Sequence, residues 1–245
     1  MATVADSRTV VVTGAAAGIG AAIAQGFLAA GDTVVCLDRD RPDWSHERLH
    51  PVTVDLMDTA ATARVAAEVA NQRTVAVLVH NAGIIRPNLL EAAEAEDIEA
   101  LSRLHLGAPL VLLKAFLPGL KAGGGRVVLI SSRAALGVVT RSAYSATKAG
   151  LIGLARTWAL ELAPHGVTVN VVAPGPVGST TMFEALVPPG SATEDKVTAS
   201  IPMRRLGRPD DVANAVRFFA DPRSDFVTGQ VLYVCGGASV GVAPL

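Results

Sequence analysis

The sequence has few cysteine and aromatic residues and no excess of charge of either sign. Its two cysteines, Cys36 and Cys235, lie far apart in apolar segments, outside any CxxC pair or Cys/His cluster. This spacing excludes a disulfide framework and a zinc site, and it fits a reducing compartment. The 21 basic and 22 acidic residues give a net charge of −1, without any block of like charge. Nucleic acid and anionic membrane surfaces are therefore not expected as partners.

Half of the 245 residues are apolar, so we expect a single domain over residues 1–245 with a large core. No charged residue lies between Arg8 and Asp32, and this interval is long enough to suggest a membrane span. Its Ala- and Gly-rich composition is more typical of a strand, a glycine turn and a small-residue helix. It also lacks the pattern of a signal peptide. We therefore expect a soluble, cytoplasmic protein.

Short β-branched runs alternate with longer Ala- and Leu-rich segments. Candidate strands lie at 9–13, 33–37, 51–54, 74–79, 126–131, 167–172 and 230–234, and candidate helices at 19–30, 59–72, 97–120, 143–163 and 209–220. The strand segments are almost continuously hydrophobic, as in strands that are buried on both faces. This pattern predicts an α/β fold with a doubly wound, parallel, seven-stranded sheet of the Rossmann type.

Residues 174–205 include five prolines and show neither a helical nor a strand period. Long irregular segments inside a compact domain are usually functional. This one carries a group of large apolar side chains, namely Met182, Phe183, Leu186 and Val187. We expect a substrate lid near 178–205.

A glycine-rich turn joins the first strand to the first helix. Gly14 permits a tight turn, while Gly18 and Gly20 allow a pyrophosphate to approach the backbone and the helix N-terminus. The alternative is a tight strand–helix junction without a ligand, because the spacing GxxxGxG differs from the usual GxGxxG. Asp38 ends the second strand, where a carboxylate binds the adenosine ribose and repels a 2′-phosphate. NAD is therefore favoured, with NADP possible because Arg39 follows directly.

These and further motifs resemble the short-chain dehydrogenase/reductase family, in order and over essentially the whole chain. The matching segments are Thr13–Gly20 (TGxxxGIG), Val54-Asp55-Leu56, Asn81-Ala82-Gly83 (NAG), Tyr144–Lys148 (YxxxK), Pro174-Gly175-Pro176-Val177 and Gly229–Gly237. The resemblance implies a homotetramer and a nicotinamide cofactor. The predicted cofactor-binding residues are Gly14, Gly18, Ile19, Gly20, Asp38, Arg39, Asp55, Leu56, Asn81, Ala82, Gly83, Tyr144, Lys148, Pro174, Gly175 and Val177.

Tyr144 and Lys148 are four residues apart in a predicted helix, so their side chains share one face. A free phenol, with a pKa near ~10, is a poor base at neutral pH. A lysine ammonium about 5 Å away favours the phenolate by roughly 3 kcal/mol at an effective dielectric of ~20. Tyr144 is therefore the predicted general acid for carbonyl reduction and general base for alcohol oxidation. The alternative, a solvent-facing pair on an amphipathic helix, is outweighed by the accompanying motifs.

Two serines end the fifth strand, and neighbouring strand residues face opposite ways. The family's catalytic serine lies thirteen residues before its tyrosine, which matches Ser131, whereas Ser132 lies twelve before Tyr144. We choose Ser132 because it follows the strand end and a one-residue loop deletion explains the spacing. Its hydroxyl is predicted to stabilise charge on the substrate oxygen.

His105 stands where the family has a catalytic Asn whose main-chain carbonyl holds a relay water. Pro109, four residues later, has no N–H to donate to the His105 carbonyl. Three interpretations are open: the carbonyl relay persists, the ring itself shuttles protons, or His105 is structural. We count His105 among the catalytic candidates.

The predicted reaction is hydride transfer between a nicotinamide cofactor and a secondary alcohol or ketone. Two alternatives remain: an NADPH-dependent 3-oxoacyl-carrier-protein reductase and a non-catalytic dinucleotide-sensing protein. Arg133 and Arg141, near the predicted catalytic residues, face either an anionic substrate group or solvent. No metal-ligand set is visible.

Overall fold

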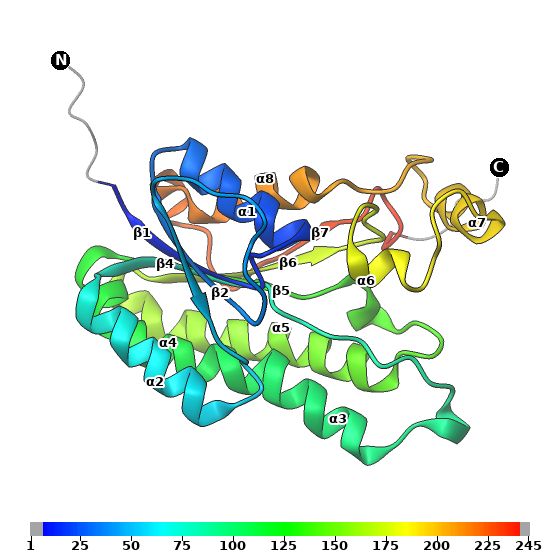
Figure 1. Cartoon of the computed structure of the whole chain (residues 1–245), viewed down its shortest axis with the longest axis horizontal. Coiled ribbons are helices and arrows are strands. Elements are labelled where there is room, and N and C mark those ends of the chain that lie inside the picture. The colour runs from blue at the N-terminus through cyan, green and yellow to red at the C-terminus, as the bar shows by residue number, and fades with distance from the viewer. Residues whose placement is uncertain (1–6, 241–245) are drawn as a thin grey trace.

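The computed structural model describes residues 7–240 and contains a seven-stranded parallel sheet with the order β3-β2-β1-β4-β5-β6-β7 (Figure 1). The strands are β1 (Thr9–Thr13), β2 (Thr33–Asp38), β3 (Leu49–Thr53), β4 (Val75–His80), β5 (Arg126–Ile130), β6 (Thr168–Pro174) and β7 (Val231–Val234). The predicted fold class is confirmed; β1 has the expected bounds, and the bounds of the other strands differ from those expected by at most two residues.

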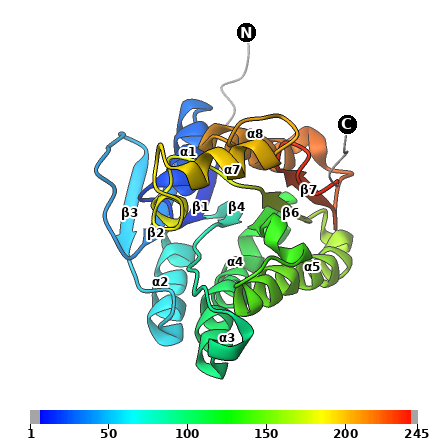
Figure 2. The ribbon, with the colours of Figure 1, turned by 90° about the vertical axis from the view of Figure 1, so that its right-hand side faces the viewer.

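Helices cover both faces of the sheet, with α1 (Gly18–Ala29) and α8 (Pro209–Ala220) on one side and α2 (Thr59–Gln72), α4 (Ala108–Gly123) and α5 (Ser142–Leu162) on the other (Figures 1 and 2). The side chains of successive β1 residues pack into the two hydrophobic cores on opposite faces of the sheet. Val11 packs in the cluster with Phe116, whereas Val10 packs in the cluster with Phe27. Burial on both faces explains why the strands lack polar alternation.

The helix predicted at 97–120 is divided by a π-helical segment, Arg103–Gly107, between α3 (Ala95–Ser102) and α4. The Ala108 N–H donates to the Arg103 carbonyl, five residues back, instead of to that of Leu104. Pro109 at the start of α4 has no N–H to offer. The predicted irregularity around His105 is thus a π-bulge, a feature often found at functional sites.

The continuous helical stretch Ala95–Gly123 is long and apolar enough, with 29 residues, to cross a membrane. Half of its most apolar window is buried inside the protein. Leu112, Phe116 and Leu120 pack in the core under the sheet. The stretch is therefore buried to the extent typical of a core helix. The uncharged interval after Arg8 forms β1, the glycine turn and α1.

The irregular segment 174–205 contains two helices that the sequence did not predict, α6 (Thr181–Glu184) and α7 (Ala192–Ser200). The Thr180 hydroxyl caps α6 by accepting from the Phe183 N–H, and Ser191 caps α7 in the same way. Neither helix has a buried residue, so neither has the apolar period by which helices are recognised. Figure 1 shows α7 at the periphery, beyond α6.

Candidate active site

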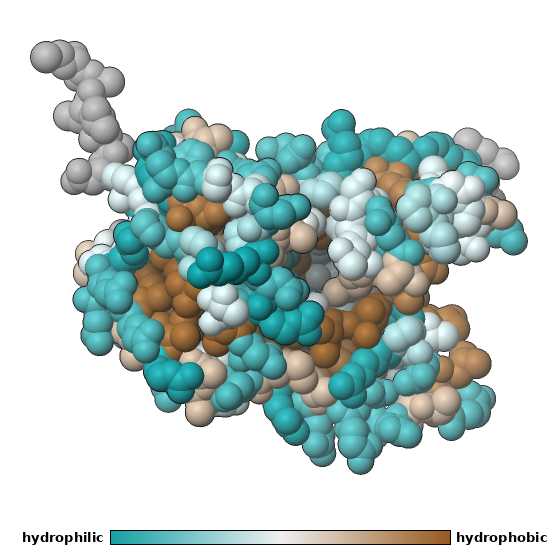
Figure 3. All heavy atoms as spheres, in the orientation of Figure 1, coloured by the Kyte–Doolittle hydropathy of each residue, from teal (hydrophilic) through white to brown (hydrophobic). Residues whose placement is uncertain are grey.

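Two adjoining cavities lie where the strands end at their carboxyl side, as expected for ligand sites in a doubly wound sheet. The larger, about 570 Å³, extends along the ends of β1, β2 and β4, and we call it the dinucleotide cleft. The smaller, about 250 Å³, lies at the ends of β5 and β6, and we call it the catalytic cavity. Both are lined by Ile19, Thr180 and Met182, so they adjoin along these three residues. In Figure 3, the surface is hollowed between the two helix layers, with apolar side chains in the hollow.

The glycine turn is shaped for close approach of a ligand to the backbone. Gly14 has a left-handed φ of 65°, and a Cβ there would lie 2.8 Å from the Ala82 Cα. A Cβ on Gly20 would overlap the Gly14 carbonyl oxygen. Helix α1 begins after Ala17 with neither a side-chain cap nor an acidic residue in its first turn. Its N-terminal N–H groups are therefore available to an anion, which fits the pyrophosphate of a dinucleotide.

Asp38 ties the end of β2 to this turn. Its Oδ2 accepts from the Ala16 N–H at 2.9 Å, and its Oδ1 accepts from the Asp40 N–H at 3.1 Å. Trp44, which the sequence analysis did not single out, donates from Nε1 to the Ala16 carbonyl at 3.2 Å. The Arg39 side chain is 76% exposed and pairs with Asp40 at 3.5 Å. The carboxylate is thus held rigidly beside the turn, while the neighbouring guanidinium lies in solvent.

The predicted cofactor residues divide between the two cavities. Those that line the dinucleotide cleft are Gly14, Gly18, Ile19, Asp38, Arg39, Asp55, Leu56, Asn81, Ala82 and Gly83. Those that line the catalytic cavity are Ile19, Tyr144, Lys148, Pro174, Gly175 and Val177. Gly20 lines neither cavity, because it is packed beneath the turn.

Tyr144 and Ser132 line the catalytic cavity together, and Tyr144 is 9% exposed. Burial raises the pKa of Tyr144, whereas hydrogen bonding by the Ser132 hydroxyl and the charge of Arg141 lower it. Ser131, the rival candidate, donates its hydroxyl hydrogen to the Lys148 carbonyl at 2.7 Å. The two serines therefore have different roles, since Ser132 faces the phenol and Ser131 joins β5 to α5.

Lys148 lies deep in the site, 3% exposed, and its Nζ donates to the Ile130 carbonyl at 2.8 Å. Burial lowers its pKa from the usual 10.5 to about 7. Its Nζ is 5.6 Å from the centre of the Tyr144 ring. The expected lowering of the Tyr144 pKa by Lys148 is not found in the protein alone, because burial outweighs the favourable charges and the lysine itself tends to lose its proton.

His105 is fully buried and lines neither cavity. Its Nε2 accepts from the Ile84 N–H at 3.2 Å, so Nδ1 carries the hydrogen and donates to the Thr147 hydroxyl at 2.8 Å. Burial, with smaller contributions from Lys148 and His80, lowers its pKa to about 2. The ring also meets Tyr144 edge-on, with centroids 5.7 Å apart. This geometry favours a neutral ring that positions Tyr144 over a ring that shuttles protons.

The second buried histidine is His80, the last residue of β4, and the sequence carries no signal for its hydrogen-bond partners. His80 Nε2 donates to the Leu104 carbonyl at 3.1 Å, the acceptor released by the π-bulge. Its Nδ1 accepts from the Thr13 hydroxyl at 3.1 Å, and that oxygen accepts from the Asn81 and Ala82 N–H groups. The Asn81 amide donates to the Gly14 carbonyl at 2.9 Å. This network joins the glycine turn, the end of β4 and the π-bulge.

Sequence comparison places these features in a known family. A family model described as enoyl-(acyl carrier protein) reductase matches residues 14–239. The chain is 35% identical over 246 residues to the (2S)-[(R)-hydroxy(phenyl)methyl]succinyl-CoA dehydrogenase subunit BbsD of Thauera aromatica, covering 96% of this chain and 98% of that one. It is 46% identical over 164 residues to the BbsC subunit of that dehydrogenase, also from Thauera aromatica, covering 66% of this chain and only 63% of the relative's length.

Similarity extends to reductases and to solved structures. The chain is 33% identical over 244 residues to the 3-oxoacyl-[acyl-carrier-protein] reductase FabG of Thermotoga maritima, covering 95% of this chain and 98% of the relative. A Beutenbergia cavernae structure with bound NADP, provisionally assigned as a gluconate 5-dehydrogenase, is 36% identical with a TM-score of 0.88, covering 96% and 97% of the two chains. The chain belongs to the short-chain dehydrogenase/reductase family and is a nicotinamide-dependent oxidoreductase.

Proposed function

We propose that this protein is an NAD-preferring oxidoreductase that interconverts a secondary alcohol and a ketone, with Tyr144 as general acid and base. The observation that carries the proposal is the buried Tyr144 beside Ser132, with Lys148 one helical turn away, in the catalytic cavity. When bound, the reduced nicotinamide supplies a hydride, with its electron pair, to the carbonyl carbon. Tyr144 then gives its hydroxyl proton to the carbonyl oxygen, which yields the alcohol.

The other residues of the site orient the substrate oxygen, return the proton to Tyr144 and hold the Tyr144 ring in position. Ser132 donates a hydrogen bond toward the oxygen on which charge develops. Lys148, with a pKa of about 7, exchanges a proton readily at neutral pH and returns a proton to the Tyr144 phenolate. His105 acts as a positioning residue, because it holds Thr147 and the edge of the Tyr144 ring. Lys148 belongs to α5, His105 belongs to the π-bulge, and Ser132 caps the short turn that follows β5, so each group is held by regular structure.

The preference for NAD rests on the charges around the ribose end of the dinucleotide cleft. Three carboxylates and two guanidinium groups line it, from Asp38, Asp40, Asp43, Arg39 and Arg41. The Arg39 guanidinium already pairs with Asp40. An added 2′-phosphate would meet a net negative charge, whereas the ribose hydroxyls can donate to Asp38.

A 3-oxoacyl-carrier-protein reductase is the second candidate. Full-length similarity to FabG of Thermotoga maritima favours it. The two proposals separate on cofactor and substrate: the second requires efficient reduction of a 3-oxoacyl thioester with NADPH. A non-catalytic dinucleotide sensor has no support in the dehydrogenases and reductases that this chain resembles.

We also propose that α6 belongs to a substrate lid, that the enzyme is a cytoplasmic homotetramer, and that α4 and α5 contribute to its interfaces. Met182, Phe183 and Leu186 line the catalytic cavity, which supports the assignment of α6 to the lid.

Leu110 on α4 and Leu160 on α5 are 44% and 80% exposed, which supports a subunit interface there. Sedimentation of the purified protein tests the assembly.

The decisive experiment is a screen of secondary alcohols and ketones that follows the absorbance of the reduced cofactor, repeated with Tyr144→Phe. We expect the substitution to lower kcat by about 10²- to 10⁴-fold while leaving NADH affinity nearly unchanged. Tyr144→Phe with full activity contradicts the assignment of the acid. Binding of NADH without turnover of any alcohol or ketone contradicts the proposed reaction.

A further inference from the structure

Among the described residues that line the catalytic cavity, three have basic side chains and none has an acidic one. Lys148, Arg133 and Arg141 line it. Its other polar side chains, from Ser131, Ser132, Tyr144 and Thr180, are hydroxyls. Within residues 7–240, neither arginine has a carboxylate oxygen within 4.0 Å, although other arginines of the protein make such bridges. Two half-buried guanidinium groups that line one cavity without a protein counter-ion are available to an anionic ligand.

Arg141 is held in place by its own turn. Its Nη1 donates to the Thr140 hydroxyl at 2.7 Å. Thr140 has a left-handed φ of 67°, which is rare for a β-branched residue. The Thr140 carbonyl accepts from the Asn88 N–H at 3.0 Å and fixes this turn to the neighbouring loop. These hydrogen bonds hold the guanidinium beside the cavity that Arg141 lines.

Both arginines lie beside the reacting groups. Arg133 follows Ser132 directly, and the charge of Arg141 is close enough to lower the pKa of Tyr144. Neither residue lines the dinucleotide cleft, where the glycine turn and the N-terminus of α1 are available to the phosphates. The natural partner of these cations is therefore the second substrate rather than the cofactor.

We propose that the substrate is an oxo acid and its hydroxy acid counterpart, whose carboxylate is bound by Arg141 and Arg133. This inference rests on the proposed function, since it names the substrate class of the same site. A carboxylate accepts paired hydrogen bonds from a guanidinium, which orients the molecule as well as binding it. Ile85, Val138, Phe183 and Leu186 supply an apolar wall for the remaining carbon chain.

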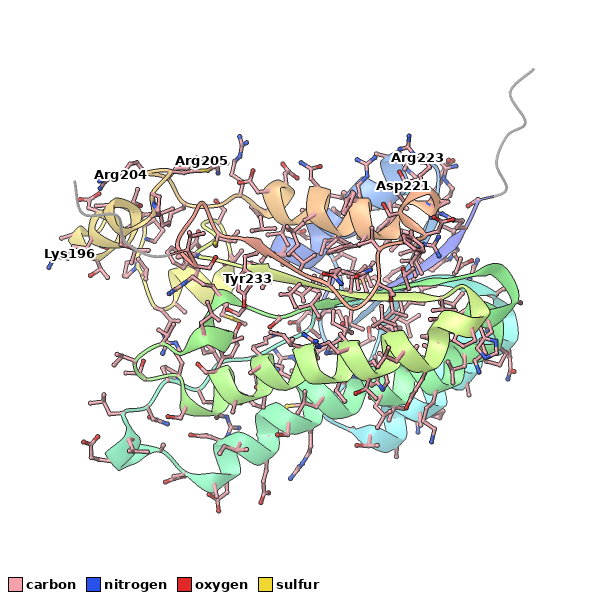
Figure 4. The ribbon with its side chains drawn as sticks, turned by 180° about the vertical axis from the view of Figure 1, so that it is seen from behind. Lys196, Arg204, Arg205, Asp221, Arg223 and Tyr233 are labelled. Carbon is pink, nitrogen blue, oxygen red and sulfur yellow. The ribbon has the colours of Figure 1, made fainter. Side chains whose placement is uncertain are left out.

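The test compares aliphatic oxo acids, with the ketone at successive positions, with the carboxamide of each acid. An acid and its amide have nearly the same shape and differ in charge. For the unaltered enzyme, we expect kcat/KM to be roughly 10- to 100-fold higher for the preferred acid than for its amide. Arg141→Gln and Arg133→Ala should each reduce this ratio several-fold. The control is Arg223→Ala, which removes an exposed guanidinium at the opposite end of the molecule from α7 (Figure 4).

Three outcomes oppose the inference. Amides reduced as efficiently as the acids by the unaltered enzyme would overturn it. An acid preference that both arginine variants retain would overturn it as well, as would an equal loss of preference in Arg223→Ala. In each of these cases, turnover that depends on Tyr144 leaves the proposed oxidoreductase function standing. If no ketone, charged or neutral, is reduced, the proposed function and this inference fall together.

Discussion

The two cavities of the site recognise their ligands by different means. The dinucleotide cleft presents backbone: a glycine turn, the N-terminus of α1 and the ends of three strands. Its charged side chains are mainly acidic and lie at the ribose end. The catalytic cavity presents side chains, which are apolar apart from hydroxyls and three cations. One half is therefore suited to a ligand with phosphates and hydroxyls, and the other to an apolar ligand with a negative charge.

Because of this difference, the two cavities should tolerate amino-acid substitutions to different degrees. Main-chain N–H groups are available from most sequences, provided that glycine allows the ligand to approach, so the cofactor half depends on few side chains. The substrate half depends on the identity of each lining residue. Apart from the proton-transfer groups, variants of the catalytic cavity should change which alcohol is used, and variants of the cleft should change which cofactor binds and how tightly.

The largest effect on activity is expected from substitution of Lys148, which lies behind Tyr144 in the catalytic cavity. Lys148→Met should lower kcat by about 10²- to 10⁴-fold, because the tyrosine loses its proton supply. The same variant should be more stable than the unaltered protein, since Lys148 is buried and no carboxylate in the described part of the chain pairs with it. Activity assays and chemical denaturation of the cofactor-free protein measure the two effects.

The pH dependence of that stability gain has a definite sign. Because folding lowers the pKa of Lys148 from 10.5 to about 7, the unfolded chain binds more protons between these values. The destabilisation is complete below pH 7 and fades as the pH rises toward 10.5. The gap between Lys148→Met and the unaltered protein should shrink by about 2 kcal/mol between roughly pH 6 and pH 8.5. A constant or widening gap contradicts a buried, depressed lysine.

A second substitution tests the role of the acidic side chains in the dinucleotide cleft. Asp38→Ser removes the carboxylate nearest the glycine turn, and we expect the preference for NADH over NADPH to fall by about 10- to 100-fold. Asp43→Ser is the matched control, since Asp43 lines the same cleft but makes no hydrogen bond to the turn within the described chain. Steady-state kinetics with both cofactors measures the shift. Equal effects of the two variants would mean that general charge, not contact with the ribose, sets the preference.

A smaller effect is expected at His105, which lies behind both cavities. His105→Asn should destabilise the protein by about 1–3 kcal/mol through the loss of buried hydrogen bonds. The pH–rate profile should keep its shape, because a ring with a pKa of about 2 stays neutral in the working range. Thr147→Val, which removes the hydroxyl that the ring holds, should have a similar effect on stability. A profile that loses one ionisation in His105→Asn would restore the ring to the proton path.

The smallest effect is expected at the strained turn of the catalytic cavity. Thr140→Asn should stabilise the protein by about 1 kcal/mol, because Asn adopts the left-handed region more readily than a β-branched residue. Ser179 also has a positive φ, 56°, but is not β-branched. Ser179→Asn should therefore change the melting temperature less. A reversal of this order would show that Thr140 is not strained.

Most of the site could be predicted from local signals. Gly14, Asp38, Tyr144 and Lys148 are found by their spacing and by their position after strands or within a helix, because regular backbone makes spacing equivalent to direction. The two helices of the segment 174–205 were missed because neither buries a residue. The hydrogen-bond partners of His80 and the role of Trp44 could not be predicted, because these contacts join residues distant in sequence; Thr13 and His80 are 67 positions apart.

By itself, the sequence determined the parallel sheet, the glycine turn, the helical pairing of Tyr144 with Lys148 and the break that Pro109 imposes near His105. Each of these follows from properties of adjacent residues or from periodicity. Only the tertiary structure decided which serine faces the phenol, which state the two buried histidines adopt and how far the pKa of Lys148 falls. Those outcomes depend on burial and on hydrogen-bond partners brought from other strands, because the free energy of a charge or a polar group is set by its surroundings.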